Sequence, residues 1–482
     1  MERIQVDFSI QQGVIKNMDA VNNGPVGGNV RIPGKSNFDL YKEAGFSYAR
    51  NHDASFCHAY GGEHSVDVHR IFKNFDADEN DPANYIFEPT DKYLLNTVAA
   101  GTKIFYRLGA SIEHGFKYGT RVPKDFHMWA RICEHIIRHY NEGWADGYRL
   151  GIEYWEIWNE PDCHNPDGSN PCWQGTNEQF IELYCVSAKH LKEQFPDLKI
   201  GGPAFCLAYA TDCSDGFVHN FLTAVKESGA PLDFYSYHCY ANAPSCLSQM
   251  AFAVRKYLDE YGFENTETNL NEWNYVQGWT DELWAYTIKA EQDLKGASFV
   301  TAAMSLCQAA PLDMLMYYDA RPCAMNGLFM DDFKPLKGYY SFIAFQRLKE
   351  LGTYVPVRCE DGALYGCAAT DGKRHALMLT YFDNEARGSL DITFEKWKIN
   401  EEEASYRDCY GEVTAGGVDA LDIDRCDVCI GLENLNGPFK ARFYCTDEEK
   451  NLALVREEEF PAGTTELHLN MTVFSTWLVE IE

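Results

Sequence analysis

Short runs of β-branched and aromatic residues alternate with longer amphipathic stretches through the first two-thirds of the chain. The short runs have the length and composition of buried strands. They are Gly13–Asn17, Phe46–Asn51, Lys103–Leu108, Glu153–Trp158, Lys199–Gly202, Asp233–His238, Thr268–Glu272 and Met314–Tyr318. Apolar residues recur at helical spacing over Asp125–Tyr140, Asn177–Phe195, Phe217–Ser228 and Trp284–Ala303. Alternation of strand and helix predicts an α/β fold, a (β/α)8 TIM barrel over residues 13–348. An open doubly wound sheet is the alternative, but no glycine-rich phosphate loop follows the early strands.

After residue 348 the pattern changes to strand-like runs separated by Asp, Gly and Asn clusters, which is typical of antiparallel sheet. The runs are Ala376–Phe382, Leu390–Phe394, Phe439–Tyr444 and Thr464–Leu469. We therefore expect a C-terminal antiparallel β-sandwich domain over residues 349–482. The N-terminal segment 1–12, with its strand-like run Arg3–Ile10, is expected to join this sandwich, and Trp477–Ile481 is expected to close it.

Two glutamates follow barrel strands at the edge where such barrels build their active sites. Glu160 comes after the fourth predicted strand, where Pro161 prevents further strand pairing, and Glu272 ends the seventh. Two carboxyl groups facing one cleft are what glycosidic bond hydrolysis needs. Glu156, deeper on the fourth strand, is expected to be an interior ion-pair partner.

Composition narrows the classes of partner. The formal net charge of −30 repels nucleic acid and anionic membranes, so neither is expected as a partner. No apolar run is long enough to span a membrane, and the first residues lack the pattern of a secretory signal, so we expect a cytoplasmic protein. The 17 cysteines are then expected to be reduced. Cys163 and Cys172 bracket a loop and would pair only in a chain that had lost a signal peptide.

No metal and no cofactor are expected. Cys426 and Cys429 form an isolated C-x-x-C pair without a second pair at zinc spacing. The early histidines lie at intervals that no helix or strand places on one side, and they are His52, His58, His64 and His69.

The motifs Trp-Asn-Glu-Pro at 158–161 and Asn-Glu-Trp-Asn at 271–274 are similar to those of the retaining clan of (β/α)8 glycosidases. Further matches lie at 45–52, 199–204, 233–240 and 334–340. The ordered set resembles glycoside hydrolase family 39, which includes β-xylosidases and α-L-iduronidases. This resemblance implies Glu160 as general acid/base and Glu272 as nucleophile. It also implies a set of substrate-binding residues, namely Asn159 at the hydroxyl next to the anomeric carbon, His238 and Tyr240 near the nucleophile, and His52 at the glycone.

Three further residues bear on the substrate. Trp279 follows the nucleophile strand and either walls the leaving-group side or packs in the core. Family β-xylosidases carry a Trp-containing segment on strand eight, where this chain has Tyr317, which we take as a substrate-binding candidate. Arg321 follows it, and either meets a carboxylated sugar or neutralises Asp319 or Glu272.

The sequence thus predicts a retaining exo-glycosidase that releases a terminal sugar by double displacement, with β-xylosidase-like specificity first. Arabinosides, galactosides and uronides stay open as substrates. The alternatives are a catalytically silent carbohydrate-binding barrel and an endo-acting glycanase. A homo-oligomer stays open.

Overall fold

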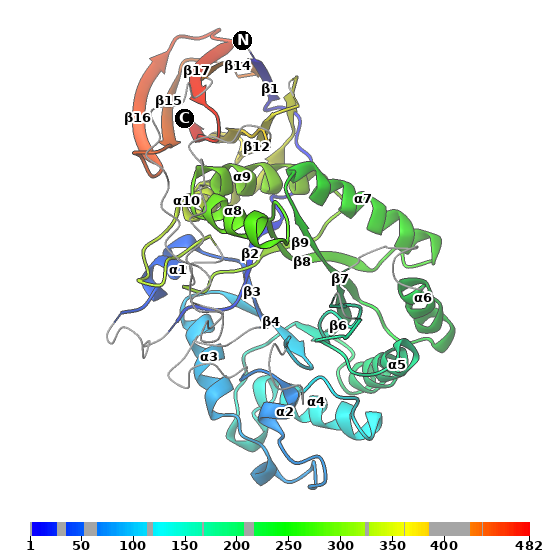
Figure 1. The fold of residues 1–482 in the computed structure, drawn as a ribbon. Helices are drawn as coiled ribbons and strands as arrows, with labels where there is room; N and C mark the ends of the chain where they lie inside the picture. Colours follow the sequence, from blue (N-terminus) through cyan, green and yellow to red (C-terminus); the bar gives the residue numbers. More distant parts are fainter. Residues whose placement is uncertain are drawn as a thin grey trace.

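The fold is a barrel with a β-sandwich at its side (Figure 1). The computed structural model describes residues 2–26, 35–52, 65–112, 119–165, 168–206, 216–322, 327–360, 362–384, 425–435 and 437–482. Within these ranges eight parallel strands close into a barrel in chain order. They are β2 Asn17–Asn22, β3 Tyr48–Asn51, β4 Lys103–Leu108, β5 Tyr154–Ile157, β6 Lys199–Phe205, β7 Phe234–Ala241, β8 Glu267–Tyr275 and β9 Met314–Tyr317. The predicted (β/α)8 barrel with an accessory sandwich is therefore confirmed.

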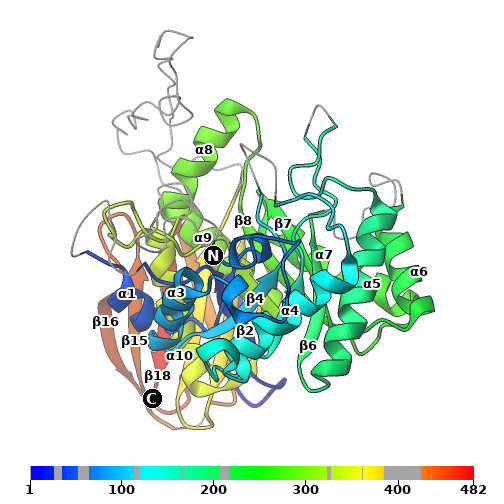
Figure 2. The ribbon, with the colours of Figure 1, turned by 90° about the horizontal axis from the view of Figure 1, so that it is seen from below.

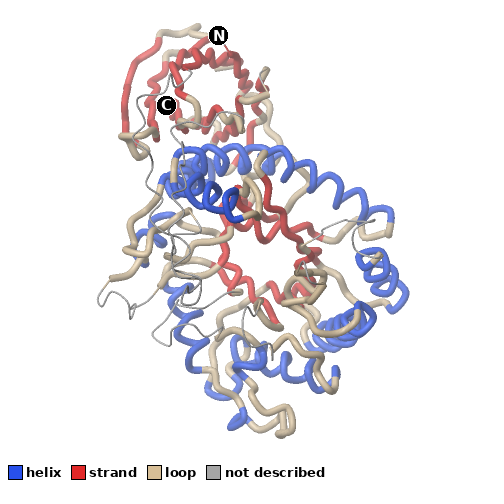
Figure 3. The backbone as a smooth tube through the Cα atoms, viewed as in Figure 1, coloured by secondary structure: helices blue, strands red, loops and turns tan. Residues whose placement is uncertain are grey.

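Helices surround the ring of strands, as the tube in Figure 3 shows. They are α1 Phe38–Ala44, α2 Val68–Ile71, α3 Glu88–Ala99, α4 Phe126–Asn141, α5 Asn177–Gln194, α6 Phe217–Ser228, α7 Pro244–Glu260, α8 Asp281–Gln292, α9 Leu294–Ala309 and α10 Lys337–Leu351. Two 3-10 turns lie at Pro82–Asn84 and Trp144–Asp146. Polar caps set several starts: Asp125 accepts from two amides of α4, and Thr176 forms a capping box with Gln179 at α5.

Two element predictions were wrong. The first barrel strand is β2, not Gly13–Asn17. The hydrophobic pattern did not reveal β2 because it contains polar residues such as Asp19, which is buried and paired with Lys349. The single helix expected over Trp284–Ala303 is two helices. Asp293 is extended, with ψ −170°, and its carboxylate accepts from the amide of Leu294, so it ends α8 and caps α9.

Two sheets form the sandwich. Among the described residues one sheet has the order β11-β1-β14-β17 and the other the order β10-β12-β13-β18-β15-β16. The strands are β1 Glu2–Asp7, β10 Thr353–Val355, β11 Val357–Cys359, β12 Leu364–Thr370, β13 His375–Tyr381, β14 Arg425–Glu433, β15 Phe439–Thr446, β16 Ala453–Phe460, β17 Glu466–Thr472 and β18 Thr476–Ile481. Pairing is antiparallel except that β1 runs parallel to β14. The expected run Leu390–Phe394 lies outside the described residues.

The sandwich packs on the barrel through α9 and α10, which contact β12 and β13. Figure 2 shows the fold turned by 90° and seen from below, where the sandwich strands β15, β16 and β18 overlap the side of the barrel that carries α10. Ser298 of α9 shares a hydrogen bond of 2.7 Å with Thr380 of β13, so the contact is partly polar. In the part of the chain that is described, no helix combines the length and the apolar character needed to cross a bilayer.

Candidate active site

Along strand β7 the inward-facing side chains change from apolar ones in the barrel core to polar ones beside the two glutamates. Its alternate residues point inward, because side chains alternate along a strand. Phe234 belongs to the apolar floor of the barrel, with Phe105, Tyr154 and Met316. One step higher, Ser236 donates to Glu156 at 2.6 Å. His238 and Tyr240 follow toward the carboxyl ends of the strands, where Glu160 and Glu272 lie.

The two glutamates face one another across His238. His238 Nδ1 lies 2.8 Å from Glu160 Oε1 and 3.5 Å from Glu272 Oε2. One carboxylate oxygen of each glutamate and one His238 nitrogen all lie within 4.8 Å of one another. The sequence separated these glutamates by more than a hundred residues, and the barrel brings them together.

The backbone at Glu160 is strained. Trp158 and Glu160 both have positive φ, 78° and 46°, which costs energy for residues other than glycine. The amide of Glu160 donates to the carbonyl of Ala204 at 3.0 Å, and the Trp158 indole donates to the carbonyl of Cys172 at 2.9 Å. These contacts hold a conformation that turns the Glu160 side chain toward the barrel axis.

Arg50 organises the interior, and sequence reasoning missed it. Its guanidinium is fully buried and donates to Glu156 Oε2, Glu272 Oε1 and Asn159 Oδ1, each at 2.7 Å. It also donates to Asn22 at 3.1 Å. A buried charge is retained only when it is paired, so Arg50 fixes Glu272 and Asn159 relative to one another. The signal in the sequence was a charged residue inside an otherwise buried strand.

The environments of the two glutamates differ. Burial, reinforced by the negative charges of Cys163 and Asp162, raises the pKa of Glu160 to about 8. Burial also raises the pKa of Glu272, but His238, Arg50 and the Tyr240 hydroxyl oppose this shift. Because Arg50 and Tyr240 both donate directly to Glu272, the ionised form is stabilised there. Glu160 therefore suits a proton donor at neutral pH, and Glu272 suits an anion.

His238 is held neutral in this setting. Burial lowers the pKa of its imidazole to about 4, against the pull of Glu272. Its Nε2 is buried and has no hydrogen-bond partner among the described protein atoms. Tyr240 donates its hydroxyl to Glu272 Oε2 at 2.8 Å, and burial raises the pKa of that phenol well above its usual range. Both residues lie where the sequence analysis placed them.

His52 also reaches Glu272. Arg107 Nε donates to His52 Nδ1 at 3.1 Å, and because a guanidinium only donates, Nδ1 must accept. The imidazole proton is therefore on Nε2, which lies 3.5 Å from Glu272 Oε1. Arg107 is in turn held by the buried carboxylate of Asp67. Of the four early histidines, His58 and His64 lie outside the described residues.

Aromatic rings form one rim of the site. Trp279 is 67% exposed, stacks on Trp284 at 5.1 Å and meets the Tyr240 ring edge-on at 5.7 Å. Tyr318 lies 6.5 Å from the rings of both Tyr240 and His52. Trp279 thus belongs to this rim and not to the core. Tyr318, which sequence reasoning did not select, joins it.

Tyr317 is placed elsewhere. Its ring packs against Trp273 and Phe342 of α10, and its hydroxyl accepts from Asn274 at 3.0 Å. The structure does not bring it to the two glutamates, because Tyr317 points to the helix layer while Tyr318 points to the rim. Arg321 donates to Asp319, one of the two carboxylates that the sequence analysis offered as its partner.

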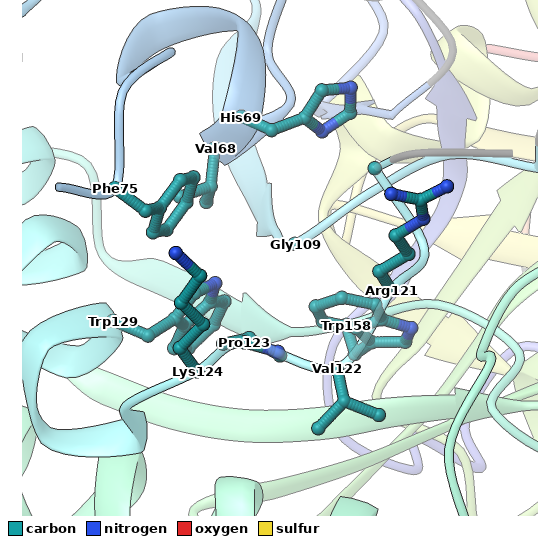
Figure 4. A pocket seen from close by; sticks show the side chains of 11 residues that line it. Val68, His69, Phe75, Gly109, Arg121, Val122, Pro123, Lys124, Trp129 and Trp158 are labelled. Carbon is teal, nitrogen blue, oxygen red and sulfur yellow. The ribbon is translucent and has the colours of Figure 1, made fainter.

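A cavity of about 210 Å³ lies beside the end of β5 (Figure 4). Trp158, Trp129 and Gly109 line its inner part, and His69, Arg121 and Lys124 add nitrogen atoms to its wall. Among the described residues its lining includes neither glutamate. It adjoins the site through Trp158, two positions before Glu160.

Within the described ranges, three groups of side chains have donor atoms close enough to share a metal ion. One is Glu160, His238 and Glu272 itself, and a second adds Cys163 and Cys172 to Glu160. The third, Cys429 with Glu466 and His468, lies on two strands of the sandwich. Hydrogen bonds from the thiols of Cys172 and Cys206 hold the pKa of Cys163 well below its usual range.

Residues 40–282, half of the chain, match the family model for glycosyl hydrolases family 39. The chain belongs to this family. The matched segment contains both glutamates and runs from α1 to the start of α8.

Relatives of family 39 align with parts of the chain. A β-xylosidase of Geobacillus stearothermophilus is 28% identical over 253 residues, which are 49% of this chain and 44% of that protein. An α-L-iduronidase of Mus musculus is 28% identical over 138 residues, 26% of this chain and 20% of that protein. The chain thus aligns with less than half the length of these relatives.

Solved structures share the fold over the whole chain. A glucosidase from Croceicoccus marinus superposes with a TM-score of 0.73 at 20% identity, covering 100% of this chain and 99% of that one. A monomeric β-xylosidase from Caulobacter crescentus does so with a TM-score of 0.70 at 17% identity and the same coverage. At these identities the likeness shows a shared fold and no more.

Proposed function

We propose that the protein is a retaining exo-glycosidase that releases a terminal sugar, β-xylose in the first instance, by double displacement. The observation that carries this is the short separation of the Glu160 and Glu272 carboxylate oxygens, within 4.8 Å of one another. Retaining glycosidases hold their two carboxyl groups about 5–5.5 Å apart, whereas inverting ones need more room for a water molecule.

In the first step Glu272 attacks the anomeric carbon while Glu160 gives its proton to the leaving oxygen. Arg50 and Tyr240 hold the Glu272 carboxylate by one oxygen each, which fixes the direction of attack. Because Arg50 occupies Asn159 Oδ1, the donor that Asn159 offers to the neighbouring sugar hydroxyl is its Nδ2. The bond from Glu272 to the sugar forms as the glycosidic bond breaks.

In the second step Glu160 changes role. Once Glu272 is esterified, its negative charge no longer faces Glu160. Because like charges repel, the loss of that charge makes it easier for Glu160 to become ionised. The Glu160 carboxylate then takes a proton from water, which attacks the anomeric carbon and releases Glu272. His238, which is neutral and lies between the two, stabilises either carboxyl without adding charge.

The sugar is assigned from the relatives and from Arg321. The matched curated proteins are named β-xylosidases and an α-L-iduronidase, which makes xylosides the first choice and uronides the second. Arg321 is engaged by Asp319, which disfavours a sugar carboxylate at that position. Arabinosides and galactosides are kept as further candidate substrates in the panel described below. The exposed face of Trp279 suits stacking of the leaving group.

The test is a panel of aryl glycosides with wild type, Glu272→Ala and a control, Glu182→Gln, an exposed carboxylate on α5. The panel covers β-xylose, α-arabinose, β-galactose, β-glucose and α-iduronic acid. We expect turnover of one sugar, lost in Glu272→Ala and kept in the control. Release of monosaccharide alone from oligosaccharides supports exo action, while mixed fragments support an endo-glycanase. No turnover, with sugar binding retained, would support a silent carbohydrate-binding barrel.

A further inference from the structure

Two thiols lie beside the carboxyl group of Glu160, and a third adjoins one of them. Cys163 and Cys172 come from the loop between β5 and α5, and Cys206 follows the end of β6. Cys172 Sγ lies 3.8 Å from Glu160 Oε2, and Cys163 Sγ lies within 4.8 Å of Cys172 Sγ and of a Glu160 carboxylate oxygen. The Cys206 thiol lies next to that of Cys163. All three are free cysteines.

Backbone contacts fix these cysteines in place. The Cys163 amide donates to the carbonyl of Glu160 at 3.1 Å. The Cys206 amide donates to the buried carboxylate of Asp162 at 3.0 Å, and the Cys172 amide donates to the side chain of Asn170 at 2.8 Å. The cluster is therefore preorganised by two neighbouring strand ends and is not a chance meeting of long side chains.

The donor set is that of a thiophilic cation. Zinc in proteins takes four ligands in a tetrahedron, with sulfur about 2.3 Å and carboxylate oxygen about 2.0–2.2 Å away, so its ligand atoms lie roughly 3.5–4 Å from one another. The Cys172–Glu160 distance of 3.8 Å falls in this range. Cys163 is partly exposed, which gives an ion a way in, while Cys172 is buried.

We propose that Glu160, Cys163 and Cys172 bind a thiophilic divalent cation such as Zn²⁺, with water as the fourth ligand, and that this ion inhibits the enzyme. The inhibition rests on the role of general acid proposed for Glu160. A carboxylate bound to the ion cannot protonate a leaving group, so occupancy stops the first step. Binding displaces the protons of the ligands, and removal of the ion returns them, so inhibition is reversible.

Sequence spacing did not suggest this site, because Glu160, Cys163 and Cys172 do not have the spacing of a paired C-x-x-C zinc motif. The ion proposed here is an inhibitor, so the expectation that catalysis needs no metal is unaffected. The Cys429, Glu466 and His468 group offers a comparison within the same chain. It has one sulfur donor, and its glutamate and histidine are exposed.

Binding is tested first, without reference to activity. The full chain, reduced and freed of metal by a chelator, is titrated with Cd²⁺ while the ultraviolet charge-transfer absorption of cadmium–thiolate bonds is recorded. We expect saturation at one ion per chain in wild type and in the control Cys429→Ser. In Cys163→Ser and in Cys172→Ser the affinity should fall at least about tenfold. An unchanged titration in both variants, or loss in Cys429→Ser, would overturn the proposal.

Inhibition is tested second, on the best substrate of the glycoside panel. Each variant is compared with its own metal-free rate. Zn²⁺ should inhibit wild type and Cys429→Ser at the concentrations that fill the site, and a chelator should restore the rate. Cys163→Ser should need at least about tenfold more Zn²⁺. Cd²⁺ binding with no inhibition of an active enzyme would refute Glu160 as ligand, whereas Cd²⁺ binding by a chain without glycosidase activity would refute only the proposed function.

Discussion

The raised pKa of Glu160 makes a quantitative prediction for the dependence of kcat/KM on pH. The group must be protonated to act as an acid, so activity falls as pH rises through its pKa of about 8 in the free enzyme. At pH 7 such a carboxyl is about nine-tenths protonated, and at pH 9 only about one-tenth. We therefore expect kcat/KM to be about tenfold lower at pH 9 than at pH 7.

The matching perturbation is Glu160→Gln, which keeps the shape and removes the proton. On a glycoside with a poor leaving group, loss of general acid catalysis should lower kcat/KM by about 10²–10⁴-fold. On an activated nitrophenyl glycoside the leaving group needs little protonation. The variant should therefore lose far less of the rate of the first step on this substrate. The decline above pH 8 should disappear in the variant, because the group that titrates there is gone.

The assay is initial-rate kinetics from pH 5 to pH 10 on both substrates, with Glu182→Gln as control. If Glu160→Gln kept the decline near pH 8, another group would cause it. If the variant lost the same factor on both substrates, the interpretation of Glu160 as acid would be refuted.

Three further substitutions test the surroundings of the nucleophile. Arg50→Met leaves buried carboxylates without their cation and should destabilise the protein by about 3–5 kcal/mol, seen as a large drop in melting temperature. Tyr240→Phe removes a hydrogen bond to the Glu272 carboxylate and should lower kcat/KM by roughly 10–100-fold, whereas Tyr317→Phe, with its hydroxyl bonded to an amide away from the site, should change kcat/KM less than about twofold. Trp279→Ala should raise KM several-fold and leave the melting temperature unchanged, because this ring is exposed at the rim. Equal kinetic losses in both tyrosine variants, or a stability loss in Trp279→Ala, would contradict these placements.

Sequence patterns located most elements because local chemistry and burial agree there. Strand β4 and helix α6 have the predicted bounds, and Gly229 ends α6 in the left-handed conformation that favours glycine. β2 was missed because its buried polar residues bind partners elsewhere in the barrel: Asp19 forms an ion pair with Lys349, and Asn22 accepts a hydrogen bond from Arg50. A strand that builds the polar interior of a site does not have the hydrophobic pattern of a buried strand.

The site shows the same division. Glu160 and Glu272 were selected because their motifs combine a strand end with a carboxyl group, and the barrel then places both at one rim. Arg50 was missed because its role depends on partners from three other strands. The sequence analysis selected Tyr317, but the structure places Tyr318 at the rim and Tyr317 against α10. Which of two adjacent tyrosines faces the site depends on the exact end of β9, and the sequence does not show where that strand ends.

The central claim is that Glu272 carries the sugar between the two steps. It is tested most directly by treating the enzyme with an activated 2-fluoro glycoside of the sugar found in the panel and locating the adduct by peptide mass spectrometry. The account predicts one sugar per chain, on the peptide containing Glu272, and none in Glu272→Ala. An adduct on Glu160, or turnover with inverted anomeric configuration and no adduct, would contradict it.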